Sequence, residues 1–189
     1  MSQSREKQKI WNVPNALTIL RALLIPVYWY LFMNGHTYWA LAVFIIASLT
    51  DLADGYIARK YDLVTDFGKL MDPLADKLMV LSVMLSLALK GMAPWAALLV
   101  LLVKEGLMVL GGALLLKKGV VVYARKIGKI AQATVVSGLL LSFFHEWILQ
   151  HLGFPLHHVV IWCAVALTLC ALVSYGRSAW KSYQEVTKK

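Results

Sequence analysis

The chain has 189 residues, of which 60% are apolar and only 15% are Asp, Glu, Lys or Arg, and its formal net charge is +9. Soluble domains are closer to half apolar and a quarter charged, so this composition excludes a water-soluble globular protein and a disordered one. Two cysteines are too few for a disulfide-rich scaffold. Because the basic residues lie between long apolar runs, we expect the positive charge to face anionic lipid and not nucleic acid.

Six apolar runs are long enough to cross a bilayer, whose hydrocarbon core takes about 20 residues of helix. In chain order they cover roughly residues 15–33, 38–58, 73–89, 94–116, 129–148 and 157–176. Their connections are short, so the sequence predicts an all-α membrane bundle of six transmembrane helices, with residues 1–189 as a single domain. For the segment before the first run the sequence leaves two alternatives, a short helix on the inner membrane surface or a frayed tail.

Lysine and arginine are unequally distributed between the two sides of the predicted bundle. Fifteen of them fall in the N-terminal segment, the second-to-third and fourth-to-fifth connections, and the C-terminal tail, whereas the opposite loops contain Lys90 alone. The positive-inside rule therefore predicts cytoplasmic N- and C-termini in a multi-pass protein of the cytoplasmic membrane.

Acidic residues are concentrated where the second and third apolar runs meet. Asp51 and Asp54 are three apart at the end of one run, and Asp72 and Asp76 are four apart at the start of the next, so each pair shares a helix face. Four carboxylates packed in a low dielectric repel one another unless cations compensate them, and oxygen ligands favour Mg²⁺ or Mn²⁺. The alternative is a structural set of carboxylates paired with nearby basic residues, namely Arg59, Lys69 and Lys77.

Small residues accompany these carboxylates on the same two faces. Gly55, Ala58 and Gly68 either allow close helix packing or leave room for a bulky ligand beside the carboxylates. Arg59, at the cytoplasmic end of the first face, suits either a phosphate group or an ion pair.

The stretch DLADGYIARKYDLVTDFGKLMDPLAD resembles the signature of the CDP-alcohol phosphatidyltransferases, D-x2-D-G-x2-A-R-x8-G-x3-D-x3-D. All eight specified positions of residues 51–76 match in identity and spacing: Asp51, Asp54, Gly55, Ala58, Arg59, Gly68, Asp72 and Asp76. The layout of six runs extends the resemblance over nearly the whole chain. The opening VPNALTILR and the stretch DFGKLMDPLADKL are similar to the phosphatidylglycerophosphate synthase branch of the family.

The resemblance implies an enzyme that moves a phosphatidyl group from CDP-diacylglycerol to an alcohol and releases CMP. It also implies a homodimer, and two divalent cations, Mg²⁺ or Mn²⁺, bound by Asp51, Asp54, Asp72 and Asp76, with Asp76 as the general base. It assigns the CDP and diphosphate groups of the donor to Asn15, Thr18, Asp54, Gly55, Ala58, Arg59 and Gly68.

Three polar residues of the first run have further alternatives. Asn15 and Thr18 lie three apart, and they either cap the first helix or hydrogen-bond the donor diphosphate. Arg21 lies one turn deeper and needs an anionic partner.

The acceptor alcohol is predicted less directly. Glycerol 3-phosphate, which gives phosphatidylglycerol phosphate, requires a second cationic pocket, for which the candidates are Lys104, Arg125, Lys129 and Arg177. The resembled branch usually has Arg-Glu where this chain has Lys104-Glu105, and the alternative for this pair is mutual ion pairing. Arg125 and Lys129 also suit a purely positive-inside role.

Two other functions remain as alternatives. The same chemistry with phosphatidylglycerol as acceptor would give cardiolipin. A divalent-cation transporter would use the carboxylates as an ion path, since intramembrane acids commonly mark such paths.

Overall fold

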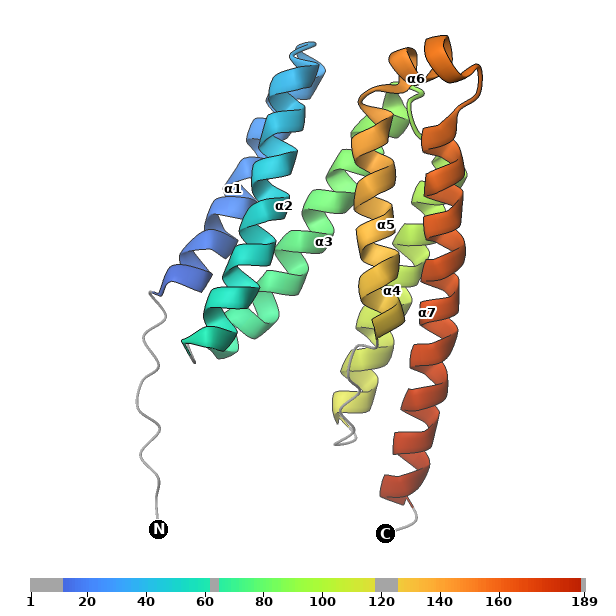
Figure 1. Cartoon of the computed structure of the whole chain (residues 1–189). Helices are drawn as coiled ribbons and strands as arrows, with labels where there is room; N and C mark the ends of the chain where they lie inside the picture. Colours follow the sequence, from blue (N-terminus) through green and yellow to red (C-terminus); the bar gives the residue numbers. More distant parts are fainter. Residues whose placement is uncertain (1–11, 62–64, 118–125, 188–189) are drawn as a thin grey trace. The chain divides into compact units, whose positions relative to one another are not determined.

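A computed structural model describes residues 12–61, 65–117 and 126–187, and within these ranges all the regular secondary structure is helical (Figure 1). The helices in chain order are α1 (Val13–Met33), α2 (Thr37–Lys60), α3 (Asp66–Leu89), α4 (Trp95–Lys117), α5 (Lys126–Ser142), α6 (His145–Leu152) and α7 (Leu156–Thr187). This confirms the predicted all-α class. The chain divides into two compact units, Met1–Ser86 and Leu87–Lys189, and the single domain over residues 1–189 stays a prediction.

The start of α1 is fixed by its local sequence. The Asn12 side chain accepts a hydrogen bond from the Asn15 N–H at 2.9 Å, and Pro14 occupies the first turn, where a missing N–H leaves no helical bond unmade. Asn12 therefore caps the helix, which leaves the Asn15 side chain available for contacts with other helices.

In the first unit, α1 and α2 run side by side in opposite directions (Figure 1). The α3 helix joins α1 through a 2.6 Å hydrogen bond between the hydroxyls of Tyr28 and Ser86, both of which are buried. Tyr28 stacks on Phe32 with ring centroids 5.6 Å apart, and Phe44 of α2 is fully buried. A buried, largely aromatic core thus joins α1 to α2 and α3, the two helices that carry the acidic residues.

In the second unit, α7 packs against α4 and α5, and α6 lies beside one end of α7 (Figure 1). A methyl group at Gly138 of α5 would lie 2.8 Å from Ile161 Cγ1 of α7 and 3.3 Å from its backbone nitrogen. Such close approach requires a residue without a Cβ, as is common where membrane helices pack.

The prediction that residues 129–148 form one continuous helix was wrong. The α5 helix ends at Ser142, and α6 begins at His145 at an angle of 81°. The Phe143 and Phe144 N–H groups bond to the Leu140 and Leu141 carbonyls, three residues back, which tightens the last turn and ends the helix.

Two other helices extend beyond the predicted apolar runs. The α3 helix begins at Asp66, seven residues before the predicted start at 73, and α7 continues to Thr187, past the predicted end at 176. Polar residues occupy both extensions, so hydropathy alone could not include them.

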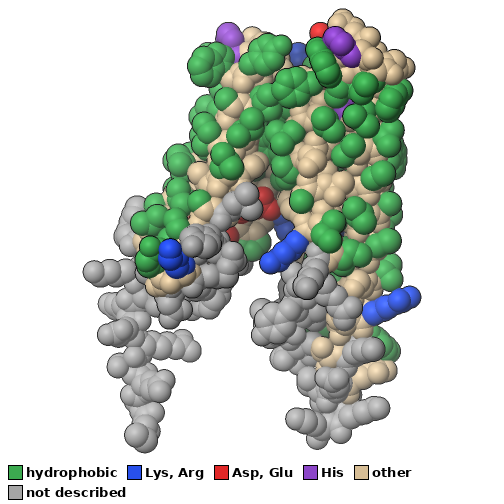
Figure 2. Space-filling model, viewed as in Figure 1, with side chains coloured by type: hydrophobic (Ala, Val, Ile, Leu, Met, Phe, Trp, Pro, Cys, Tyr) green, Lys and Arg blue, Asp and Glu red, His purple; other side chains and the backbone are tan. Residues whose placement is uncertain are grey.

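Three helical segments among the described residues are long and apolar enough to cross a membrane: Val13–Met33, Trp95–Gly112 and Leu156–Trp180. The bent pair Ile127–Ser142 and His145–Leu152 would make a fourth if it is one span. Large apolar side chains on these segments are exposed, including Leu23, Leu110 and Val173, and apolar side chains cover much of the visible surface (Figure 2). A surface of this kind indicates a multi-pass membrane protein, because soluble monomers rarely expose so much apolar area.

The number of spans stays at three or four by this measure, against six in the sequence prediction. The apolar part of α2, Thr37–Asp51, is too short to count as a membrane-crossing helix. The predicted second run has Asp51 and Asp54 at its end, and the predicted third run, which is part of α3, is also not among the segments that qualify, so the count falls short at both. The expected orientation of the termini stays a prediction, and the expected N-terminal surface helix lies outside the described residues.

Candidate active site

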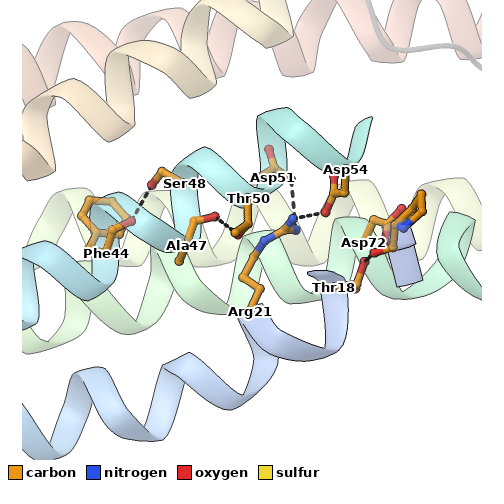
Figure 3. Close-up of polar contacts among 10 residues, drawn as sticks. Thr18, Arg21, Phe44, Ala47, Ser48, Thr50, Asp51, Asp54 and Asp72 are labelled. Carbon is orange, nitrogen blue, oxygen red and sulfur yellow. Dashed lines mark hydrogen bonds and ion pairs between the residues drawn. The ribbon is translucent and has the colours of Figure 1, made fainter. Parts of the chain in front are cut away.

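Two of the four predicted cation ligands meet a buried arginine of another helix. Arg21 of α1 is 1% exposed, and its Nη1 lies 3.0 Å from Asp51 Oδ1 while its Nη2 donates to Asp54 Oδ2 (Figure 3). Asp54 is buried, whereas the Asp51 side chain keeps 38% of its surface exposed. Asp51 and Asp54 share one face of α2 because they are three residues apart, so one guanidinium reaches both.

The third predicted ligand, Asp72 of α3, also contacts α1. The Thr18 hydroxyl donates a hydrogen bond to Asp72 Oδ1, and the Pro14 carbonyl oxygen lies 3.1 Å from the same hydroxyl (Figure 3). Asp72 also interacts electrostatically with Asp51 and Asp54. Side chains of α1 therefore bring the acidic ends of α2 and α3 to one region of the first unit.

Gly68 of α3 lies close to Asn15 of α1. A methyl group there would lie 2.8 Å from Asn15 Oδ1, 3.2 Å from Thr65 Oγ1 and 3.5 Å from Asp72 Oδ2. The Thr65 hydroxyl accepts a hydrogen bond from the Gly68 N–H at 3.0 Å and donates to Asn15 Oδ1, also at 3.0 Å. Three side-chain oxygen atoms thus lie so close to Gly68 that a residue with a Cβ would crowd Asn15.

The fourth predicted ligand, Asp76, is half-buried and lies four residues after Asp72, on the same face of α3. Gly55, Ala58 and Arg59 belong to α2, but their side chains lie outside the described part of the structure. The roles predicted for them therefore stay predictions.

The predicted acceptor residues belong to the second unit. Lys104 and Glu105 of α4 form an ion pair with Nζ and Oε1 2.6 Å apart, and each side chain is only 14% exposed. Lys129 and Arg177 are exposed, and Arg125 lies outside the described residues. Ion pairing, the alternative weighed for Lys104, is therefore present, and this residue set stays a prediction as an acceptor site.

The residues at the α1–α3 contact fit a hard divalent cation by the chemistry of their donor atoms. Asp51, Asp54 and Asp72 supply carboxylate oxygens, and the side-chain oxygens of Asn15 and Thr65 lie near Gly68. In the described parts of the chain, however, no three acidic, histidine or cysteine side chains already converge as a ligand set. The carboxylates instead make contacts with Arg21 and Thr18.

Sequence reasoning missed two contributors to this site. Thr65 directly precedes α3 and hydrogen-bonds both Asn15 and the Gly68 N–H, and a threonine just before a helix is a recognisable cap signal. Asn12 was likewise recognisable as a cap before Pro14. Arg21 was expected to need an anionic partner, but its periodicity within α1 gave no indication of which acids it would contact.

Comparison with known proteins identifies similar sequences over most of the chain. The family model for CDP-alcohol phosphatidyltransferase matches residues 11–170. The CDP-diacylglycerol–glycerol-3-phosphate 3-phosphatidyltransferase of Bacillus subtilis is 35% identical over 192 aligned residues, covering 92% of this chain and 97% of the relative. The protein of the same name from Rickettsia typhi is 38% identical over 180 residues, covering 91% of this chain and 98% of its own. A probable phosphatidylglycerophosphate synthase of Mycobacterium tuberculosis is 33% identical over 181 residues, covering 89% and 82%.

Proposed function

The chain belongs to the CDP-alcohol phosphatidyltransferase family and is an enzyme, and we propose that it transfers a phosphatidyl group from CDP-diacylglycerol to glycerol 3-phosphate. The products are phosphatidylglycerol phosphate and CMP. The observation that carries this proposal is the meeting of Asp51, Asp54 and Asp72 with polar residues of α1 in the first unit. The names of the Bacillus and Rickettsia relatives support this donor and this acceptor.

Asp51, Asp54, Asp72 and Asp76 would hold two divalent cations, Mg²⁺ or Mn²⁺. When bound, such ions neutralise the donor diphosphate and stabilise the CMP leaving group. The protein contributes position: the α1 contacts to Asp54 and Asp72 restrict these side chains before substrate arrives. In-line displacement at phosphorus depends on such positioning and on charge neutralisation more than on covalent chemistry.

Asp76 is the proposed general base. It would accept the proton of the acceptor hydroxyl as that oxygen attacks phosphorus, and general bases contribute typically about 10²–10⁴-fold to a rate. Asp76 is half-buried one turn from Asp72, so it keeps access to solvent while it lies beside the proposed cation site.

The remaining donor contacts use the small and polar residues around Gly68. Gly68 would contact part of the donor's CDP group through its backbone, with Asn15 and Thr18 offering hydrogen bonds to that group. Gly55, Ala58 and Arg59 would complete this surface from α2. For the acceptor phosphate we propose Lys104, Arg125, Lys129 and Arg177, whose positive charge suits a dianionic group.

The cellular setting follows from the charge distribution. We propose a multi-pass protein of the cytoplasmic membrane, with six spans and both termini in the cytoplasm, because the basic connections lie on the side of the acidic cluster. A homodimer is part of the proposal, and nucleic acid is not a partner.

The test is an acceptor assay on the purified protein in detergent with CDP-diacylglycerol and Mn²⁺ or Mg²⁺. Labelled glycerol 3-phosphate and labelled phosphatidylglycerol are supplied in separate reactions, and CMP release is measured with the lipid product. We expect CMP and labelled phosphatidylglycerol phosphate with glycerol 3-phosphate, and no CMP without a divalent cation.

Each other outcome selects a different function. Product formation only with phosphatidylglycerol would make the protein a cardiolipin synthase. Cation flux in liposomes, with no CMP released by either acceptor, would favour the transporter alternative and reject the transferase.

A further inference from the structure

Arg21 is the most completely buried cation of the first unit's described residues. Its side chain is 1% exposed, and its Nε and Nη1 atoms have no hydrogen-bond partner in the described parts of the chain. Only Nη2 is hydrogen-bonded, to Asp54, and the contact of Nη1 with Asp51 at 3.0 Å is an ion pair. Hydrogen-bond geometry alone therefore does not account for a buried arginine at this position.

The charge of Arg21 does account for it. The contacts with α1 bring Asp51, Asp54 and Asp72 to one region, and like charges repel strongly in a low dielectric. One guanidinium between Asp51 and Asp54 offsets part of this repulsion from inside the helix contact (Figure 3). The two contacts also differ in burial, because Asp54 is buried whereas the Asp51 side chain keeps 38% of its surface exposed.

We propose that Arg21 is a built-in counter-cation of the acidic cluster, and that divalent cations bound at Asp51 and Asp54 take over part of this neutralising role. Arg21 is thus a positioning residue: it holds Asp54 in place and leaves the more exposed Asp51 able to turn toward an ion. This inference rests on the proposed cation site but assigns a role to a residue outside the family signature.

The counter-cation role predicts a result that a purely packing role does not. In Arg21→Gln the buried carboxylates lose their compensating charge, and breaking a buried pair on one side is strongly destabilising. A divalent cation can restore that charge, whereas it cannot restore lost packing. The effect of Arg21→Gln on the melting temperature should therefore depend on the divalent cation.

The experiment measures the melting temperature, in detergent, of wild type, Arg21→Lys, Arg21→Gln and the control Lys90→Gln, each with EDTA and with Mn²⁺. Lys90 is the matched loss of one positive charge, and it follows the far end of α3, about 27 Å along the helix from Asp72. Without divalent cations we expect Arg21→Gln to melt lower than wild type by on the order of 10 °C. Mn²⁺ should recover at least half of that deficit, and Arg21→Lys should lose less.

If Mn²⁺ stabilises wild type, equal losses for Arg21→Gln with EDTA and with Mn²⁺ would overturn the inference. A melting temperature of Arg21→Gln equal to that of wild type in EDTA would also overturn it. The double variant Arg21→Gln/Asp54→Asn covers the case in which Arg21→Gln does not fold. Because it removes both partners of the pair, it should fold and melt above the single variant. A double variant that is no more stable than Arg21→Gln would also overturn the inference.

The wild-type titration separates this inference from the proposed function. A wild-type protein with no Mn²⁺-dependent shift would reject the two-cation proposal. The role of Arg21 would then be decided by the double-variant comparison alone, which needs no divalent cation.

Discussion

The two units of the molecule treat buried charge differently. In the first unit, Arg21 and Thr18 of α1 contact Asp51, Asp54 and Asp72, which lie 30 to 54 residues away in the sequence and on two other helices. In the second unit, Lys104 pairs with Glu105, its immediate neighbour on the same helix. Long-range pairs depend on how helices pack, whereas a neighbouring pair can form on one helix alone.

This difference supports the first unit as the place of the proposed chemistry. Contacts between helices keep the carboxylates of the first unit in fixed positions, which phosphoryl transfer requires. Lys104 and Glu105 neutralise each other's charge without a second helix, so the identity of the basic residue can vary more easily there. This agrees with a chain that matches the family signature fully at residues 51–76 but has lysine where the resembled branch usually has arginine.

Asp76→Asn should give the largest loss of activity. Removing the proposed base should lower the transfer rate by about 10²–10⁴-fold. Because Asp76 is also a proposed cation ligand, Mn²⁺ should still raise the melting temperature through the other three carboxylates, but by less than in wild type. The measurement is CMP release together with thermal melting. Glu146→Gln, an exposed carboxylate on α6, is the control and should retain wild-type activity. Full activity in Asp76→Asn would remove the base role.

Asp51→Asn should weaken activity and cation dependence together, by on the order of tenfold or more in each, because one carboxylate ligand is lost. The measurement is the transfer rate as a function of Mn²⁺ concentration. An unchanged midpoint of that titration would contradict ligation by Asp51.

Gly68→Ala tests the close contact between Gly68 of α3 and Asn15 of α1. The added methyl group would lie 2.8 Å from Asn15 Oδ1, so we expect activity to fall by about tenfold and the free energy of unfolding to fall by about 1–3 kcal/mol. Gly106→Ala on α4 is the matched control, because its methyl group would meet nothing within 4 Å. A Gly68→Ala protein as active as Gly106→Ala would argue against a tight donor site there.

Lys104→Gln should change the turnover rate least, because it should act on KM instead of kcat. If Lys104 contributes to the acceptor phosphate site, the KM for glycerol 3-phosphate should rise by about tenfold, with little change in kcat. Lys104→Arg should keep the wild-type KM or lower it, because arginine can bind phosphate through two hydrogen bonds. Equal KM values in all three proteins would reduce Lys104 and Glu105 to a structural ion pair.

The acidic cluster was predictable because its spacing is local. Asp51 and Asp54, and likewise Asp72 and Asp76, are less than two turns apart, so helical periodicity alone gives each pair a common face. The contacts of Arg21 with the acids, and of Thr65 with Asn15, were not predictable in this way, since they depend on the relative rotation of two helices. The bend between α5 and α6 was missed for a related reason: apolar residues such as Phe143 and Phe144 continue through it and hide the end of the helix.

The contacts of Asn15 with Thr65, and of Thr18 and Arg21 with the acids, all fall between residues 15 and 72. During translation, every one of these partners has been synthesised while more than half of the chain is still to be added. All of these residues are thus synthesised before α4. A chain whose synthesis stops within a later helix still contains every one of them.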